Sequence, residues 1–215
     1  KALRTLAREL KLGPGLAHYL DDVFLARRPA NPDVLFIGND PRSCDIMKCR
    51  EAVSAAVVRW NDAYYFYGER TEGLVRVNGR VVLDYMVRRI EYTDRLEIKG
   101  EHLLFADLLF RFELKGDPRE RSFHIVRRAG GAAQQFLLSP EPVAGSLGTV
   151  SVRGCHLVLR HGEGGGDIAL EGVPHQGGEA IACLDNRILI ENTYLFDLSQ
   201  QIKSLILSDA IGAKL

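Results

Sequence analysis

The sequence has no excess of charge of either sign. Its 215 residues include 28 Lys and Arg and 28 Asp and Glu side chains, so the formal net charge at pH 7 is zero. A neutral chain has no long-range field that would draw it to nucleic acid or to an acidic membrane surface. Basic doublets such as Arg88-Arg89 are balanced by equal acidic content and are typical of a solvated sheet face. We therefore expect no nucleic-acid partner.

Long apolar runs and abundant cysteine are also missing. No apolar run approaches the roughly 20 residues of a transmembrane helix, so we expect no direct membrane insertion by this chain. The four cysteines are too few for a disulfide-built scaffold. Cys44 and Cys49 are separated by four residues, a poor match to the tighter spacing of zinc knuckles. These features favour reduced thiols and a cytoplasmic protein, and the first residue, Lys1, leads us to expect a piece of a longer one.

Sequence signatures of catalysis and of metal binding are absent as well. The run 162–166 lacks the lysine and the following helix of a phosphate-binding loop, and it is better explained as a flexible turn. Ser151 lies in no G-x-S-x-G motif, so a nucleophilic triad with His156 and Asp167 has no support. Cys155 and His156 are neighbours near an expected strand and point to opposite faces, which argues against a shared metal ion. We therefore predict no enzyme activity, no cofactor and no metal.

The sequence does contain a series of short apolar runs. The runs recur about every 8–12 residues, which is typical of a β-sandwich or barrel. Asn78-Gly79 lies between two such runs and predicts a tight hairpin, because both turn residues take positive φ. A second hairpin is expected at Lys99-Gly100. The runs lie at 34–37, 55–60, 63–67, 74–77, 80–83, 95–98, 101–105, 123–126, 136–138, 156–159, 168–170 and 180–182.

Helical periodicity is expected only near the two ends of the chain, over 2–11, 16–27 and 200–211. Residues 115–120 contain glycine and proline and are interpreted as a boundary. A ten-residue similarity between 95–104 and 187–196 suggests two copies of one small fold. The predicted domains are an N-terminal helical segment and linker (1–32), two β-sandwiches (33–114 and 120–198) and a C-terminal helix (199–215).

Residues 33–110 resemble a forkhead-associated (FHA) domain. Four motifs carry the resemblance, in the family's order and with similar spacing. Residues 36–46 are similar to the opening I-G-R-D-P-x-x-D-I, and residues 53–58 are similar to V-S-x-x-H. Residues 72–80 are similar to T-N-G-T-f-V-N-G, and residues 93–98 are similar to the closing G-D-x-i-x-i. The resemblance implies an eleven-stranded β-sandwich whose loops at one end bind phosphothreonine peptides.

The same resemblance implies a set of phosphate-site residues, and this sequence keeps few of them. Asn39 stands in place of the family's arginine, Val57 in place of its histidine, and Gly73 in place of its loop asparagine. Ser54 stands at the family's serine, which donates a hydrogen bond to phosphate. One hydroxyl cannot replace the bidentate fork of an arginine, so the implied site is degenerate. Arg42, three residues after Asn39, is a substitute cation to consider.

Residues 122–198 resemble the same family more faintly. The segment 149–159 is similar to the motif t-V-S-x-x-H-a-x-i, with one extra residue between Ser151 and His156. No Gly-Arg pair precedes this segment. We interpret the second half as a more diverged copy. The predicted fold class is therefore mostly β, with two small FHA-like β-sandwiches in tandem and short flanking helices.

Together these patterns predict a non-catalytic protein–protein interaction or assembly module within a larger protein, such as one of a signalling or secretion machine. The partner is expected to be a folded protein domain or a peptide, and no oligomeric state is predicted. One alternative is a phosphothreonine-peptide-binding module that uses Ser54, Arg42 and Arg59. Another is a regulatory domain of an enzyme that lies outside this sequence. The predicted partner-binding residues are Asn39, Arg42, Ser54, Arg59 and Gly73.

Overall fold

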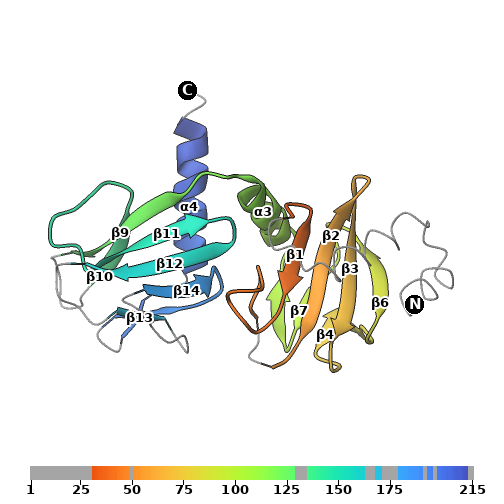
Figure 1. Ribbon diagram of the computed structural model, residues 1–215. Coiled ribbons are helices and arrows are strands. Elements are labelled where there is room, and N and C mark those ends of the chain that lie inside the picture. The colour runs from red at the N-terminus through yellow and green to blue at the C-terminus, as the bar shows by residue number, and fades with distance from the viewer. Residues whose placement is uncertain are drawn as a thin grey trace. The chain divides into compact units, whose positions relative to one another are not determined.

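The computed structural model describes residues 31–48, 51–128, 135–162, 168–170, 179–190, 193–195 and 198–212. Contacts between Cα atoms divide the chain into two compact units, residues 1–116 and 117–215. Figure 1 labels most of their strands and helices. The helices expected over 2–11 and 16–27 lie outside the described residues. Each unit has its own sheets and its own buried apolar residues.

Two antiparallel four-stranded sheets form the first unit. The first sheet has the strand order β1-β2-β3-β6, and the second has the order β5-β4-β7-β8. The strands of the first sheet are β1 (Val34–Ile37), β2 (Ser54–Trp60), β3 (Ala63–Arg70) and β6 (Met86–Ile90). The strands of the second sheet are β4 (Val75–Val77), β5 (Arg80–Val81), β7 (Leu96–Ile98) and β8 (Glu101–Leu103).

Two-residue turns set the register of these strands. Asn61-Asp62 joins β2 to β3, Asn78-Gly79 joins β4 to β5, and Lys99-Gly100 joins β7 to β8. All six turn residues have positive φ. A turn with two positive φ angles matches the right-handed twist of the flanking strands, so it closes a hairpin without splaying them. The hairpins predicted at Asn78-Gly79 and Lys99-Gly100 are confirmed.

The first sheet is apolar on both faces. Side chains alternate along a strand, so Leu35, Val57 and Phe66, which are paired in register, share one face, and all three are fully buried. Val58 and Tyr67 are buried in a cluster formed by the alternate positions. Burial on both faces holds β2 and β3 rigidly, and this rigid sheet supports the loops at the strand ends.

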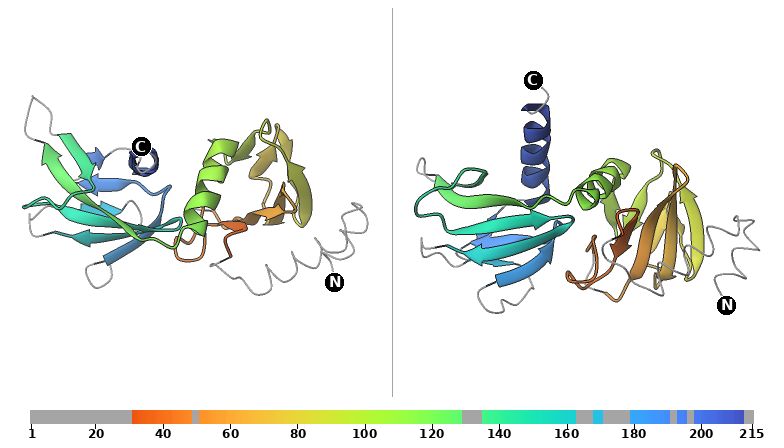
Figure 2. Two further views of the ribbon diagram at one scale, coloured as in Figure 1. Left: turned by 90° about the horizontal axis from the view of Figure 1, so that it is seen from above. Right: turned by 45° about the horizontal axis from the view of Figure 1, so that its top comes forward.

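Helix α3 (Phe105–Gly116) lies beside β1 (Figures 1 and 2). Phe112 is fully buried and packs against Tyr64 of β3, with ring centroids 5.6 Å apart. The sequence prediction of a strand over 101–105 is wrong beyond Leu103. The Leu104 carbonyl oxygen accepts the backbone N–H groups of Asp107 and Leu108, which closes the first helical turn. The sequence of this segment suits either a strand or a helix, and burial of one face of α3 favours the helix here.

The second unit also consists of antiparallel sheets. Its larger sheet has the order β10-β9-β11-β12-β14, and its smaller sheet has the order β13-β15-β16. Helix α4 (Leu198–Gly212) follows the last strand, and its Ile202 is fully buried. The strands are β9 (Arg121–Arg128), β10 (Gln135–Ser139), β11 (Gly148–Arg153), β12 (His156–His161), β13 (Ile168–Leu170), β14 (Glu179–Cys183), β15 (Ile188–Ile190) and β16 (Thr193–Leu195).

The predicted fold class is confirmed: the protein is mostly β, with antiparallel sheets of the kind found in β-sandwiches. Strand β6 was missed by the sequence reasoning, because its Arg88-Arg89 doublet was read only as surface charge. In the strand, Arg88 is half-buried and donates to the Val77 carbonyl oxygen at 3.4 Å. Within the described ranges, no helix is both long enough and apolar enough to cross a membrane.

Candidate functional site

The loop that follows β1 is shaped by one aspartate. We name residues 38–46 the β1 loop. The Asp40 carboxylate accepts hydrogen bonds from the Arg42 backbone N–H and from the Ser43 hydroxyl, each at 3.0 Å. The Asp40 carbonyl oxygen accepts the backbone N–H of Cys44 at 3.1 Å. Aspartate is favoured in such turns because its side chain replaces missing backbone partners. The tip of the loop therefore has a shape defined by its own residues.

A glycine allows the two sides of the β1 loop to approach each other. The Gly38 N–H donates to the Ile46 carbonyl oxygen at 3.1 Å. A Cβ atom on Gly38 would lie 3.2 Å from the Cβ of Cys44, closer than carbon atoms normally pack. Glycine removes that conflict because it has no Cβ. The loop thus folds back tightly against the end of β1.

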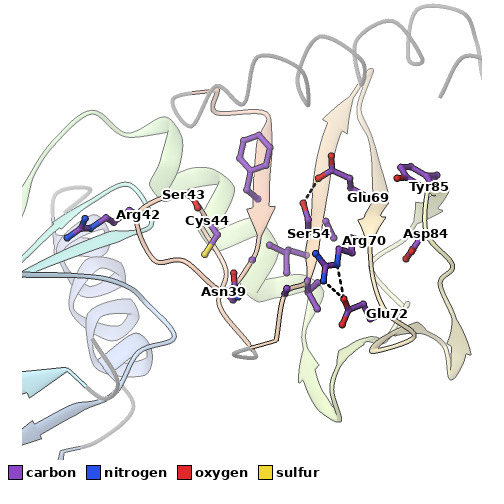
Figure 3. A pocket seen from close by; sticks show the side chains of 16 residues that line it. Asn39, Arg42, Ser43, Cys44, Ser54, Glu69, Arg70, Glu72, Asp84 and Tyr85 are labelled. Atoms are coloured by element: carbon purple, nitrogen blue, oxygen red, sulfur yellow. Dashed lines mark hydrogen bonds and ion pairs between the residues drawn. The ribbon is translucent and has the colours of Figure 1, made fainter. Parts of the chain in front are cut away.

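The β1 loop forms one wall of an open hollow of about 640 Å³. The other wall comes from the ends of β2 and β3 and from the segment that precedes β6 (Figure 3). Loops carried on a rigid sheet are a common location for binding sites. The hollow is therefore the candidate site of the first unit. Its lining residues lie in the segments 36–39, 42–44, 52–55, 69–70 and 84–85, together with Glu72.

Ser54, the first residue of β2, is already hydrogen-bonded inside the hollow. Its hydroxyl donates to carboxylate oxygen Oε2 of Glu69 on β3 (Figure 3). A β-bulge makes this contact: the register passes from Ala55↔Gly68 to Ser54↔Arg70, which leaves Glu69 as the extra residue. Bulges turn a side chain to a new direction in this way. Because a serine hydroxyl has one hydrogen to give, this arrangement leaves none for a ligand.

Arg70 brings a guanidinium to the hollow, but that group is paired. Its Nε and Nη2 atoms lie 2.7 and 2.5 Å from Oε1 of Glu72. The two side chains are 58% and 42% exposed, so the pair is screened by solvent and contributes little to stability. The pair acts mainly on the local charge, because the Glu72 carboxylate offsets the positive charge of the Arg70 guanidinium. The lining residues include three carboxylates (Glu69, Glu72 and Asp84) and two guanidiniums, which belong to Arg42 and Arg70.

Asp84 is kept ionised by hydrogen bonds from Thr71. Its Oδ1 atom accepts the Thr71 backbone N–H at 2.7 Å and the Thr71 hydroxyl at 3.0 Å. These hydrogen bonds, the backbone one first, lower the pKa of Asp84 below its usual value. The next residue, Tyr85, has a φ of 62° and is 50% exposed at the hollow. This wall therefore presents a fixed negative charge next to an exposed aromatic ring.

Three of the five predicted partner-binding residues, Asn39, Arg42 and Ser54, line the hollow. In Figure 3 the Arg42 side chain extends away from Ser54 and Arg70. Gly73 does not line the hollow: it lies in the turn between β3 and β4, with a φ of 72°. Among the described residues other than its two chain neighbours, none has a heavy atom within 4 Å of the place where a Cβ of Gly73 would be. The structure thus brings together a subset of the predicted residues.

Arg59 lies at the other end of β2 from Ser54, roughly 17 Å away along an extended strand. Its Nε and Nη2 atoms lie 2.8 and 2.7 Å from Oδ1 of Asp33. The hydrogen bond to Asp33 raises the pKa of Arg59 above its usual value. The guanidinium also lies 5.5 Å from the ring centroid of Phe112 on α3. These contacts give Arg59 a role in packing the helix on the sheet, outside the hollow.

The sequence reasoning missed several residues of the hollow, namely Glu69, Arg70, Glu72, Asp84 and Tyr85. The charged pair Glu69-Arg70, one residue beyond the aromatic run 63–67, was the available signal. Whether this pair lines the hollow depends on the pairing of β2 with β3 and on the bulge between them. Strand register is set by tertiary packing and cannot be read from one strand alone. These residues were therefore out of reach of motif comparison.

The cysteine and serine clusters considered from sequence show no reactive arrangement in the described part of the chain. Cys44, Cys155 and Cys183 are buried, and Cys49 lies outside the described residues. The Ser151 hydroxyl lies 2.9 Å from that of Ser122. Asp167, the third member of the triad weighed above, is not among the described residues. Over the described ranges, no three His, Cys, Asp or Glu side chains gather as metal ligands would.

Comparison with known proteins finds little similarity. No family model matches the chain, and no curated protein matches it in sequence. Among solved structures, the chain is similar to one described as the crystal structure of Rad53 1-466 in complex with AMP-PNP. The identity is 10% and the TM-score is 0.28, over 69% of this chain and 45% of that one. The chain thus spans less than half of that protein, and a likeness this weak carries no argument about function.

Proposed function

We propose that this chain is a non-catalytic protein–protein interaction module whose first unit binds a partner through the hollow without requiring a phosphate group. The hydrogen bond from Ser54 to Glu69 is the main support. It uses the one hydrogen that the hydroxyl can donate, and it places a carboxylate beside that hydroxyl. A phosphate would add about −1.5 to −2 charges next to this carboxylate. Like charges in contact cost several kcal/mol, so the site disfavours phosphate.

The other charged groups of the hollow support the same proposal. Arg70 is offset by Glu72, and the Asp84 carboxylate is stabilised in its charged form by Thr71. The Arg42 side chain extends away from both Ser54 and Arg70. A partner that carries polar backbone groups and uncharged side chains meets none of this repulsion. We therefore assign the hollow to an unphosphorylated segment of a protein partner.

The size of the hollow suits a short segment of chain. Ligand sites commonly enclose about 300–1,000 Å³, and the hollow has about 640 Å³. Its walls offer backbone and side-chain hydrogen-bonding groups together with the exposed ring of Tyr85. Tyrosine is enriched at protein interfaces, where it gives a large contact area at low entropic cost. A peptide or an exposed loop of a folded domain meets these requirements.

Site-specific photo-crosslinking tests this function. A photo-reactive residue would replace Asn39, which lines the hollow, and in a matched control it would replace Tyr92, which is 78% exposed and does not line it. We expect a discrete protein adduct from position 39 that forms equally well in phosphatase-treated extract. The control position should not give that adduct. An adduct that disappears after phosphatase treatment would refute phosphate-independent binding.

The competing function is a phosphothreonine-peptide-binding module, and Arg70 is the observation in its favour. Its guanidinium lines the hollow near Ser54, and its side chain is 58% exposed. Such a module needs a cation on the phosphate, so Arg70→Gln would abolish phosphate-dependent binding. Fluorescence polarisation with degenerate phosphothreonine and unphosphorylated peptide libraries separates the two functions. We expect no preference for the phosphorylated library, either in the native protein or in Arg70→Gln.

We propose the cytoplasm as the place of action and a larger signalling or secretion protein as the setting. An enzyme elsewhere in such a protein would make the same module regulatory, because the hollow would then bind a segment of its own chain. The crosslinking experiment distinguishes these cases. An adduct that links position 39 to another part of the same polypeptide supports the regulatory role, and an adduct with a separate protein supports assembly.

A further inference from the structure

A buried ion pair ties the base of the β1 loop to helix α3. The Nζ atom of Lys115 lies 2.6 Å from Oδ2 of Asp45, and the two side chains are 6% and 2% exposed. The same Oδ2 atom accepts the backbone N–H of Phe36 at 2.8 Å. Lys115 also donates to the Val34 carbonyl oxygen at 2.7 Å. One lysine of the helix therefore holds both β1 and the end of the loop.

Arg111 adds a second tie from the same face of α3. It is 4% exposed, and its Nη1 atom donates to the carbonyl oxygen of Asp45 at 2.9 Å. Residues four apart on a helix lie on one face, so Arg111 and Lys115 approach Asp45 together. Arg111 thus binds the main chain of Asp45, and Lys115 binds its side chain. These contacts span 66 and 70 positions of sequence, so they exist only when the helix is docked.

The tip and the base of the β1 loop are therefore held in different ways. The tip is closed locally by Asp40, as described above. The base is placed by α3 through Asp45, whose neighbour Cys44 lines the hollow. A buried charge that loses its partner is strongly destabilising. The loop consequently has one favoured position against the helix, and that position sets where the wall of the hollow stands.

We propose that Lys115 and Arg111 are positioning residues for the hollow: α3 holds the preformed β1 loop in the place where it can serve as a binding wall. The inference deepens the proposed function, on which it rests for the use of the hollow. Neither residue lines the hollow. Both act through Asp45, and both belong to a helix that the sequence reasoning did not identify.

Amide hydrogen exchange on the full chain tests this inference without any partner. In Lys115→Met, we expect the amides of Gly38, Asp45 and Ile46 to exchange about tenfold faster, because the base of the loop opens locally. The amides of Val57 and Phe66 in the sheet should change little. Lys115→Arg keeps the cation and should restore much of the protection. Lys99→Met is the control, because it breaks the exposed ion pair with Glu51 and leaves α3 intact.

A second variant keeps the test decisive if Lys115→Met unfolds. The double variant Asp45→Asn with Lys115→Met removes both buried charges, and the new amide oxygen still accepts the Phe36 N–H. We expect this variant to fold and to show faster exchange in the β1 loop than the native chain. Unchanged loop protection, or an increase shared equally with β2 and β3, would overturn the inference. A phosphate-dependent adduct at position 39 would instead overturn the proposed function and leave this result standing.

Discussion

Ser54 and Arg59 show how the surroundings of a residue decide its role. From sequence, both were candidates for contact with a phosphorylated partner. In the folded chain the Ser54 hydroxyl is bound to Glu69, and the Arg59 guanidinium is bound to Asp33 and lies over Phe112. Each polar group is satisfied by a residue that no motif includes. The sequence therefore shows which polar groups are present, and the tertiary contacts determine which of them are available to bind a ligand.

Replacement of Arg59 separates its packing role from binding. We expect Arg59→Met to lower the free energy of unfolding by about 1 kcal/mol, because a partly exposed ion pair and a cation–π contact are lost. Methionine keeps most of the apolar stem against Phe112. Urea denaturation measures the change. The yield of the adduct at position 39 should be unaffected, and a loss of that adduct in a folded variant would show that Arg59 belongs to the binding surface.

Asp117 makes stability depend on pH. Arg119 and Arg121 hold its pKa well below the usual carboxyl value, with the Arg119 side-chain hydrogen bond as the largest cause. A depressed folded-state pKa contributes stability in full above the unfolded value of about 4. That contribution is lost as the pH falls from there toward the folded-state pKa. We expect Asp117→Asn to cost about 0.5–1 kcal/mol at pH 7, since the arginines are partly exposed.

Urea titrations of the native chain and of Asp117→Asn at pH 7, 4 and 2.5 check this dependence. The difference between the two proteins should shrink as the pH is lowered. A difference that stays constant with pH would mean that the asparagine acts through packing or through the backbone, and not through the lost charge.

Among the elements of the first unit, helix α3 contacts both the first sheet and the β1 loop. Its Phe112 side chain is fully buried against Tyr64 and below the Arg59 guanidinium. Its Arg111 and Lys115 side chains hold the β1 loop. The helix thus contributes an apolar contact to the sheet and a polar contact to the loop. Loss of either contact should have a separate and measurable effect.

Truncation of Phe112 tests the apolar contact. We expect Phe112→Ala to lower the free energy of unfolding by about 3–5 kcal/mol, from lost apolar burial and the cavity left behind. Leu109 on the same helix is 38% exposed and provides the matched control. Leu109→Ala should cost less than about 1 kcal/mol, as expected for a partly exposed position. Equal effects of the two substitutions would show that α3 is not docked through Phe112.

Sequence alone predicted those elements whose chemistry is local. Asn78-Gly79 closes a hairpin because its two residues tolerate positive φ, whatever surrounds them. Helix α3 was missed because its residues also suit a strand, and the docked face of the helix decides between the two. The Glu69 bulge was missed because it exists only in the pairing of β2 with β3. The hollow depends on that pairing, so only Asn39, Arg42 and Ser54 were found in advance.

At the scale of the whole molecule, contacts divide the chain between Gly116 and Asp117. Each side of this boundary has complete antiparallel sheets and its own buried residues. Units built in this way commonly fold alone. The boundary lies within the segment 115–120 that the sequence marks by its glycine and proline. We therefore propose that the chain consists of two separately folding units.

Expression of residues 1–116 and 117–215 as separate proteins tests this proposal. We expect each fragment to unfold cooperatively in a thermal scan, at a midpoint within a few degrees of one transition of the full chain. Far-ultraviolet circular dichroism should show strand content in both fragments. A fragment that lacks a cooperative transition would show that its core needs the rest of the chain.

The two-residue turns of this protein bear on the order in which it folds. Asn61-Asp62, Asn78-Gly79 and Lys99-Gly100 join strands that are adjacent in sequence, so their contacts form with little loss of chain entropy. The tie between Lys115 and Asp45 must close a loop of 70 positions. We therefore expect the hairpins to become protected early in refolding and the β1 loop to become protected last. A newly made chain would then have its sheets in place before it acquires a surface that a partner can recognise.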